Sequence, residues 1–209
     1  MRVGGLWKTG RGFDSDAFFV RFNRLGRFSV APSRYNVAVP FVIRDFQNED
    51  FELLWRLDQA CFSPGIAYSR EELKSYMQHR GAFTLVAVEA GLEDQDKEGK
   101  AAMDKAGIDK DSKIAGFIVV HGGPNGHVIT IDVDPAARRS GMGSLMLRAA
   151  EDRLCAAGSR AVGLETAVDN LAALAFYKRH GYSVVRTWPR YYSNGVDALV
   201  MKKELGTSS

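Results

Sequence analysis

The segment "VDPAARRSGMGSLMLRAAEDRL", residues 133–154, decides the fold prediction because it joins a strand end, a glycine-containing turn and an amphipathic helix. The turn has the pattern R-x-x-G-x-G at Arg138, Gly141 and Gly143. Glycines let backbone N–H groups approach an anion, and the positive N-terminus of the following helix attracts one. The segment therefore predicts a phosphate-binding turn. The alternative is an ordinary glycine turn with exposed arginines.

Two other phosphate-binding motifs do not fit this turn. A Walker A loop needs G-x-x-x-x-G-K-[ST], and the chain contains no such string. A dinucleotide-binding turn needs G-x-G-x-x-G, but Met146 stands at the third glycine position of "GMGSLM". That third glycine allows close packing of helix on strand, so its absence argues against a dinucleotide site.

Length and charge limit the kind of protein. A chain of 209 residues with 45% hydrophobic residues suits one domain with additional segments. The net charge of +3 is uneven, because residues 1–39 carry seven Lys or Arg against two Asp. The remaining chain is slightly acidic, whereas a nucleic-acid-binding domain has a basic face. We therefore expect no direct nucleic-acid partner.

Cysteine content and hydropathy indicate the compartment. Cys61 and Cys155 are far apart and outside any metal-ligand spacing, which predicts reduced thiols, no metal and a cytoplasmic protein. No apolar run reaches the roughly 18 residues of a membrane span. The first residues lack the apolar stretch of a secretory signal. These observations predict no membrane association.

Hydrophobic periodicity predicts an α/β, layered (α+β) domain from residue 40 to residue 205. Helices are expected within 48–62, 69–78, 142–154 and 169–182. Strands are expected at 41–46, 82–90, 113–123, 127–133, 161–168, 183–188 and 198–203. Ser69 followed by Glu72 is a capping box that marks the start of the second helix. The order of these elements predicts one mixed sheet.

Three segments lie outside this pattern. Residues 1–39 are predicted to be a basic, loosely ordered extension, in which "DAFFVRFNRL" (16–25) could form one short helix. Residues 91–112 are charged and lack aromatics, which predicts an exposed insertion within a hairpin. Residues 206–209 form a short tail.

Three motifs together resemble the GNAT acetyltransferases, which hold the pyrophosphate of acetyl-coenzyme A (acetyl-CoA) at such a turn. They are "ITIDVDPAARRSGMGSLML" (129–147), "LETAVDNLAALAFYKRHGY" (164–182) and, more weakly, "RYYSNGVDALVM" (190–201). Within that superfamily they look like the ribosomal-protein-alanine N-acetyltransferases. The resemblance implies the GNAT fold, with a mostly antiparallel sheet of about seven strands flanked by about four helices.

The resemblance also implies how acetyl-CoA is held. The strand before the turn would bind the pantetheine arm through its backbone, with the Val133 N–H as oxyanion donor. Asn170 would lie beside the cofactor, and its other interpretation is a plain helix N-cap. The implied cofactor residues are Ile131, Asp132, Val133, Arg138, Arg139, Ser140, Gly141, Met142, Gly143, Ser144 and Asn170.

Two residues carry the implied acid–base chemistry. Glu165 lies in a strand of small and apolar residues, so its carboxylate faces either solvent or a cleft, where it would be the general base. Tyr177 stands at the family's general-acid position, where a phenol can protonate the leaving thiolate. An aromatic residue at helical spacing is more often in the core, and of the pair Phe176 and Tyr177 we expect Phe176 to be the core residue.

The residues that would bind the acceptor, the molecule whose amine receives the acetyl group, are predicted less directly. Tyr191 and Tyr192 would bind the acceptor peptide, or they are simply aromatic residues beside a turn. The opposite wall, "CFSPGIAYS" (61–69), departs from the bulkier version common among the ribosomal-protein enzymes. The four histidines show no ligand spacing and receive no role.

The resulting prediction is an enzyme, monomeric or homodimeric, that acetylates the N-terminal amine of a protein, possibly a ribosomal protein. The alternatives are a GNAT enzyme for a free small amine and a non-catalytic acyl-CoA-binding module. A binding module would need neither Glu165 nor Tyr177, which argues against the last alternative.

Overall fold

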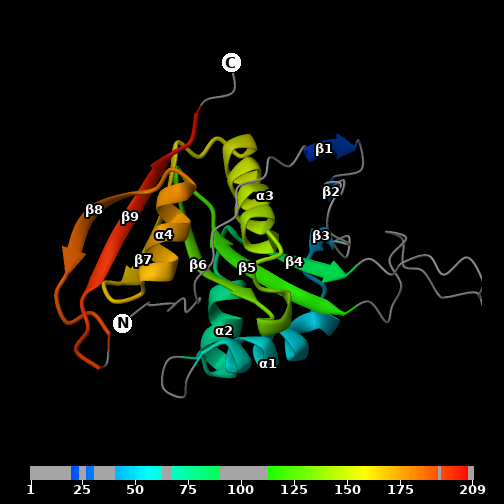
Figure 1. Cartoon of the computed structure of the whole chain (residues 1–209). Helices are drawn as coiled ribbons and strands as arrows, with labels where there is room; N and C mark the ends of the chain where they lie inside the picture. Colours follow the sequence, from blue (N-terminus) through cyan, green and yellow to red (C-terminus); the bar gives the residue numbers. More distant parts are fainter. Residues whose placement is uncertain are drawn as a thin grey trace, which may run out of the picture.

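The computed structural model describes residues 41–62, 67–89, 113–192 and 194–206, and the backbone of 20–23 and 27–30. Its strands are β1 (Val20–Asn23), β2 (Arg27–Val30), β3 (Phe41–Asp45), β4 (Ala82–Glu89), β5 (Ile114–His121), β6 (Asn125–Val133), β7 (Ala161–Ala167), β8 (Ser183–Trp188) and β9 (Ala198–Glu204). Its helices are α1 (Phe51–Cys61), α2 (Arg70–Met77), α3 (Met142–Ala156) and α4 (Leu171–Arg179). Figure 1 shows them around one sheet.

The strands form one mixed sheet in the order β1-β2-β3-β4-β5-β6-β7-β9-β8. Neighbouring strands are antiparallel except for β6 and β7, which are parallel. From residue 41 onward, the described residues form seven strands of the sheet and four α-helices. The predicted fold class is therefore confirmed.

The N-terminal segment contributes two strands that were not expected from the sequence. β1 pairs with β2, and β2 pairs with the outer edge of β3. The suggested helix at 16–25 is wrong for residues 20–23, which are in β1. The edge of β3 offers unpaired backbone groups, and this pairing outweighs the local helical pattern. The predicted insertion at 91–112 lies outside the described residues.

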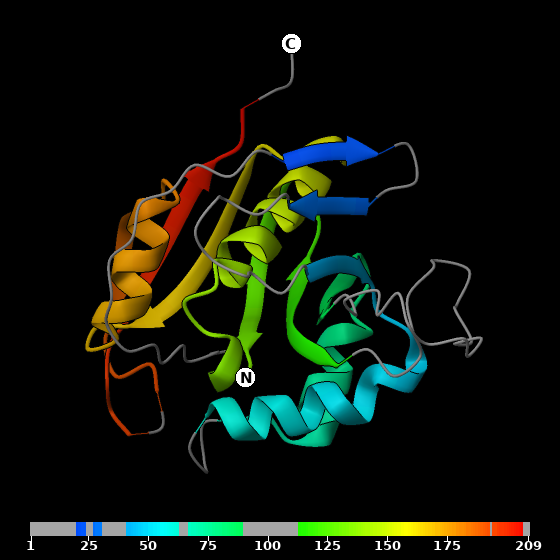
Figure 2. The ribbon, with the colours of Figure 1, turned by 45° about the vertical axis from the view of Figure 1, so that its right-hand side comes forward.

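The four helices divide between the two faces of the sheet (Figure 2). α3 and α4 bury one face through a cluster that contains Met146, Leu147, Leu154 and Tyr177. α1 and α2 bury the other through Leu54, Leu57 and Leu73, which meet Phe117 and Val119 of β5. The predicted capping box is present, because the Glu72 N–H donates to Ser69 Oγ at 3.2 Å.

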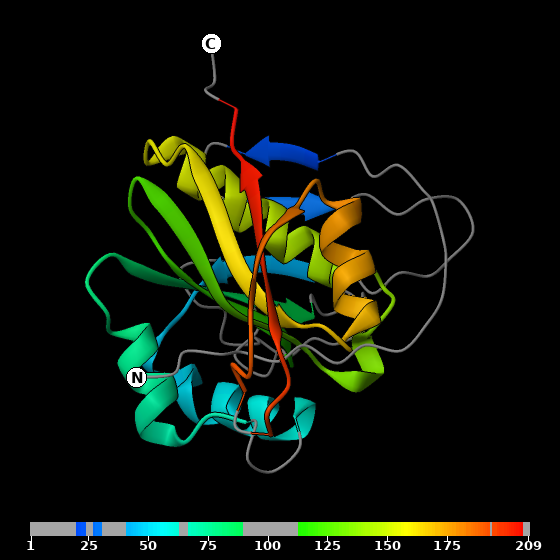
Figure 3. The ribbon, with the colours of Figure 1, turned by 90° about the vertical axis from the view of Figure 1, so that its left-hand side faces the viewer.

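β6 and β7 separate after only three paired positions. Their register pairs end at His127 and Gly163, although both strands continue. The β5–β6 register shifts between Val119 and Val120, which leaves an additional residue, Ile129, in β6. Such a bulge bends the strand. Figure 3 shows β7 continuing beside β9 as it leaves β6.

No helix of the described ranges is long and apolar enough to cross a membrane.

Candidate active site

The separation of β6 and β7 leaves backbone groups of β6 without a strand partner. The Asp134 N–H donates to the Ala115 carbonyl of β5 at 2.8 Å. Because successive N–H groups point to opposite edges of a strand, the Val133 N–H faces the side of β7. The sequence predicts this N–H as the oxyanion donor, and its direction agrees with that role. Ile131 and Val133 are buried in the α3–α4 core.

The predicted phosphate-binding turn leads directly into α3. Gly141 is the residue before the helix and has a left-handed backbone, with φ of 86°. The first-turn N–H groups of a helix lack intrahelical acceptors, so those of Gly143 and Ser144 are available to an anion. Ser140 Oγ donates to the Ala137 carbonyl at 2.7 Å and holds the turn closed.

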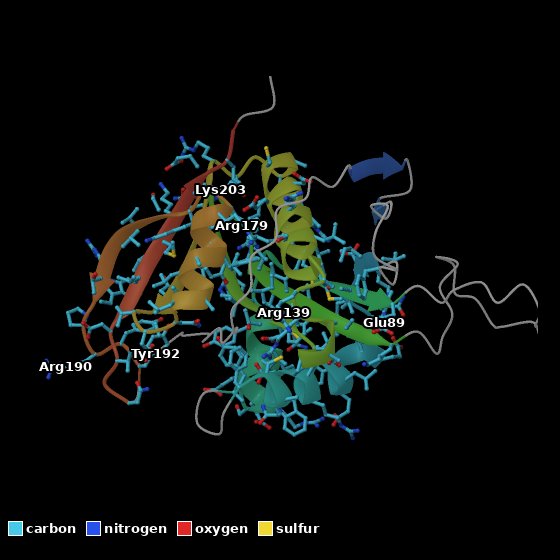
Figure 4. All side chains as sticks on the ribbon, viewed as in Figure 1. Glu89, Arg139, Arg179, Arg190, Tyr192 and Lys203 are labelled. Atoms are coloured by element: carbon cyan, nitrogen blue, oxygen red, sulfur yellow. The ribbon has the colours of Figure 1, made fainter. Side chains whose placement is uncertain are left out.

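The side chains of this turn differ in how accessible they are to a bound ligand. Arg139 is exposed at the start of α3 (Figure 4). Arg138 is half-buried, and its Nε donates to the Val133 carbonyl at 3.2 Å. The Met142 side chain is only 1% exposed and belongs to the core, so Met142 can meet a cofactor only through its backbone.

Two further side chains near the end of β7, Asn170 and Thr166, each have a buried polar atom without a partner among the described residues. Asn170 is the N-cap of α4, and its Oδ1 accepts from the Ala173 N–H at 3.1 Å. Its Nδ2 is buried and unpaired, as is the Thr166 hydroxyl. Buried polar groups are nearly always hydrogen-bonded. Asn170 is therefore an N-cap and also holds a free donor, so both of its interpretations remain compatible.

The Glu165 side chain is shielded on the α1–α2 side of the sheet and contacts a histidine. Its Oε2 lies 2.9 Å from Nε2 of His127 on β6, and the side chain is 9% exposed. His127 is the register partner of His121, whose ring stacks on His79 with 4.3 Å between centroids. Three of the four histidines thus form a row that ends at Glu165. The solvent-facing alternative for Glu165 is wrong.

Tyr177 is buried in the core beneath the opening between β6 and β7. It is 4% exposed, whereas Phe176 is only partly buried, so the expectation about this pair is reversed. Burial raises the pKa of the Tyr177 phenol, and the charges of Asp132 and Tyr192 add to the effect. The phenol therefore stays protonated at neutral pH, as a general acid must.

Tyr191 and Tyr192 lie in the loop between β8 and β9, and Figure 4 labels Tyr192 there. Tyr192 packs with Phe62, at the end of α1, and Ala198 in one cluster. Burial and the charge of Glu165 raise the pKa of Tyr191 to about 12. The Tyr192 hydroxyl is buried without a partner among the described residues. The loop thus brings two phenols close to Glu165.

Two acidic side chains, those of Asp58 and Asp132, are buried between α1 and the sheet. Asp58 on α1 and Asp132 on β6 are 0% and 1% exposed. Burial, with a smaller contribution from the charge of Asp58, raises the pKa of Asp132 well above its ordinary value. Thr130 donates to Asp132 Oδ1 at 3.2 Å, and Oδ2 has no partner among the described residues. Asp132 therefore contributes a buried acid as well as its predicted backbone.

Three residues of the site, His127, Thr166 and Asp58, were not predicted from the sequence. Asp58 had a visible signal, because it interrupts the apolar stripe formed by Leu54, Leu57 and Cys61 on α1. His127 and Thr166 had none, since their contacts depend on how β6 and β7 diverge. No group of three His, Cys, Asp or Glu side chains that could hold a metal occurs in the part of the chain described above.

A phosphate-binding turn before α3, a parallel strand pair that opens, and an acid and a tyrosine on either side of the opening define the GNAT acetyltransferases. Residues 51–182 match the Acetyltransferase (GNAT) family. The chain belongs to this family.

Two similar curated proteins are named as N-alpha-acetyltransferases. The chain is 41% identical over 83 residues to the N-alpha-acetyltransferase RimI of Mycobacterium tuberculosis, covering 39% of this chain and 51% of that one. It is 27% identical over 132 residues to N-alpha-acetyltransferase 30 of Schizosaccharomyces pombe, covering 63% and 78%. The chain spans only 21% and 62% of the length of the first two curated relatives that it matches.

Solved structures agree on the fold. The ribosomal-protein-S18-alanine N-acetyltransferase of Escherichia coli superposes with a TM-score of 0.62 at 20% identity, covering 81% of this chain and 96% of that one.

GNAT acetyltransferases use acetyl-CoA, and the residues of this chain fit it. Pyrophosphate matches the N–H groups at the start of α3 and the exposed Arg139. The unpaired Asn170 Nδ2 and Thr166 hydroxyl are buried polar groups beside the opening in which the pantetheine arm would lie. When bound, acetyl-CoA supplies an activated acetyl thioester.

Proposed function

We propose that the chain transfers the acetyl group of acetyl-CoA to the N-terminal α-amine of a protein. The observation that carries the proposal is the position of the β8–β9 loop. Tyr192 of this loop packs with Phe62 at the end of α1, and both Tyr191 and Tyr192 lie within reach of the charge of Glu165. The phenols of Tyr191 and Tyr192 are then hydrogen-bonding groups for the backbone of an entering peptide.

In the proposed reaction Glu165 takes the proton of the acceptor ammonium group. The freed amine nitrogen forms a bond to the thioester carbonyl carbon, and the carbon–sulfur bond breaks. Tyr177 gives its phenolic proton to the departing sulfur, and the second proton that the attacking nitrogen sheds as the amide forms returns, through water, to the Tyr177 phenolate. The Val133 N–H stabilises the charge on the carbonyl oxygen, a kind of contact worth a few kcal/mol.

An α-amine suits a carboxylate base better than a lysine side chain does. The ordinary pKa of an α-amino group is about 8, against about 10.4 for lysine. The relatives named as N-alpha-acetyltransferases support the same acceptor class. A ribosomal protein is our first candidate substrate, because the superposed Escherichia coli enzyme is named for one.

The test measures coenzyme A release with peptides and free amines. A peptide with an N-terminal alanine and one internal lysine is compared with the same peptide blocked by an N-acetyl group, with free lysine and with spermidine. The proposal predicts that only the unblocked peptide reacts fast. Faster release with a free amine than with every peptide would make the chain a small-amine acetyltransferase.

A further inference from the structure

The contact between Glu165 and His127 links the proposed base to a residue for which the sequence predicted no role. His127 is the last residue of β6 that pairs with β7, and its register partner is Gly163. Because glycine has no side chain, none of its atoms separates the imidazole from Glu165, two residues further along β7. The two side chains meet at 2.9 Å.

The two members of the pair differ in access to water. The Glu165 side chain is 9% exposed, but that of His127 is 34% exposed. His127 can therefore exchange a proton with solvent, whereas Glu165 is largely shielded. A hydrogen bond to a shielded carboxylate is worth more than one at the surface.

Among the described residues, Glu165 is the only carboxylate that pairs with His127. On β5, burial lowers the pKa of His121, whose ring also bonds to the Tyr76 carbonyl at 2.9 Å. His79 stacks on the outer side of His121. On β9, Lys202 is already paired with Glu204 at 2.8 Å. On the β8–β9 loop, burial and, to a smaller degree, the charge of Glu165 raise the pKa values of both Tyr191 and Tyr192.

We propose that His127 is a positioning residue for Glu165: its Nε2–H donates to Oε2 and turns Oε1 toward the acceptor ammonium group. This inference rests on the proposed role of Glu165 as base.

The first test is independent of any acceptor. Long-range ¹H–¹⁵N spectra of the imidazoles, recorded near pH 8, show which nitrogen carries the proton, and the chain has only four histidines to assign. We expect His127 in the Nε2–H tautomer and expect that preference to be lost in Glu165→Ala. An Nδ1–H tautomer, or a spectrum unchanged by Glu165→Ala, would overturn the inference.

The second test compares three substitutions of His127 by coenzyme A release. The amide of glutamine can replace Nε2–H as a donor but does not titrate. His127→Leu and His127→Asn should lower kcat about tenfold near pH 8 with an unchanged KM for acetyl-CoA. His127→Gln should recover activity to within about threefold. A merely structural histidine would not be rescued selectively by glutamine over asparagine.

Controls separate this inference from the proposed function. His180→Gln changes the histidine at the C-terminal end of α4, which bonds to the Phe176 carbonyl, and it should leave kcat unchanged. His127→Leu should add no further loss in a Glu165→Gln background, because coupled residues are not additive. Additive losses, or full activity of His127→Leu, would refute the role. If peptides do not react, spermidine replaces them as probe, and only the proposed acceptor fails.

Discussion

Gly141 and Gly158 stand just before and just after α3 and share a left-handed backbone, with φ of 86° and 83°. Only the first adjoins the phosphate-binding turn. A Cβ at Gly158 would have nothing within 4 Å. A larger residue would meet similar backbone strain at either position. The two glycines, at opposite ends of one helix, are therefore a matched pair for mutation.

Gly141→Val should weaken acetyl-CoA binding at least tenfold, or about 1.4 kcal/mol. A β-branched residue disfavours a positive φ, so the turn must move away from the geometry that presents its N–H groups. Gly158→Val should cost similar stability but leave affinity unchanged. Calorimetric titration with acetyl-CoA measures both. Equal affinity of Gly141→Val and the parent would remove the turn from the cofactor site.

Tyr177→Phe should lower turnover by about 10²- to 10⁴-fold, the usual range for general acid catalysis, with little change in acetyl-CoA affinity. The ring and its packing remain, and only the hydroxyl group, with the proton that it gives, is lost. Tyr182→Phe is the control: Tyr182 is equally buried, lies 5.5 Å from Tyr177 between ring centroids, and donates to Glu151. It should lose stability without losing turnover. Near-normal turnover of Tyr177→Phe would leave proximity as the main source of catalysis.

Glu165→Gln should reduce activity most at low pH and less as the pH rises. At low pH the acceptor amine is largely protonated, so a base is needed, whereas above its pKa of about 8 the amine is increasingly free without help. Coenzyme A release between about pH 6 and pH 9 gives the profile. Glu204→Gln, in an exposed residue of β9, is the control. A loss independent of pH would mean that Glu165 does not act as the base.

Asp58→Asn should flatten the pH dependence of stability. Burial is the main reason that the pKa of Asp58 is raised to about 7. Between its ordinary pKa and that value the folded chain holds a proton that the unfolded chain releases. The contribution of Asp58 to stability is therefore complete below about pH 4 and is lost as the pH rises through about 7. The loss is about 1.4 kcal/mol for each pH unit between the two pKa values.

Urea unfolding between about pH 4 and pH 8 measures this effect. The exposed Asp45→Asn serves as control. The amide introduced by Asp58→Asn keeps an oxygen to accept from the Tyr68 N–H, which in the parent donates to Asp58 Oδ2 at 2.8 Å. Asp132 still titrates in the variant, so a reduced slope is expected and not a flat line. An unchanged slope would show that Asp58 ionises in the folded chain as it does in the unfolded one.

Removal of residues 1–38 should leave kcat within about twofold of the parent but lower Tm by a few degrees, on the order of 1 kcal/mol. The catalytic groups lie on β6, β7 and α4, whereas the lost strands extend the sheet beyond β3. The exposed edge of β3 should also favour aggregation. Calorimetry and coenzyme A release test both statements. A truncated chain that folds but is inactive would show that residues 1–38 are needed for activity.

Much of the fold followed from local patterns in the sequence. Alternation predicted the seven strands from residue 41, and periodic apolar residues predicted α3, because burial of one face is visible along the chain. The turn at Gly141 was recognisable because its chemistry lies within a few consecutive residues. The strands at 20–23 and 27–30 were not recognisable, since their pairing depends on the free edge of β3.

The sequence by itself identified the family and predicted the glycine-containing turn before α3, because both depend on residue types at short spacing. The resemblance to that family implied Glu165 and Tyr177 as candidate base and acid, and these roles stay predictions. Only the tertiary structure decided which groups surround them. His127 meets Glu165 because β6 and β7 run in register as far as His127 and Gly163 and then part. Besides burial, the charge of Asp58 raises the pKa of Asp132, because α1 packs against β6. Neither distance in sequence nor composition carries that information, since contacts between strands and helices are set by register and packing.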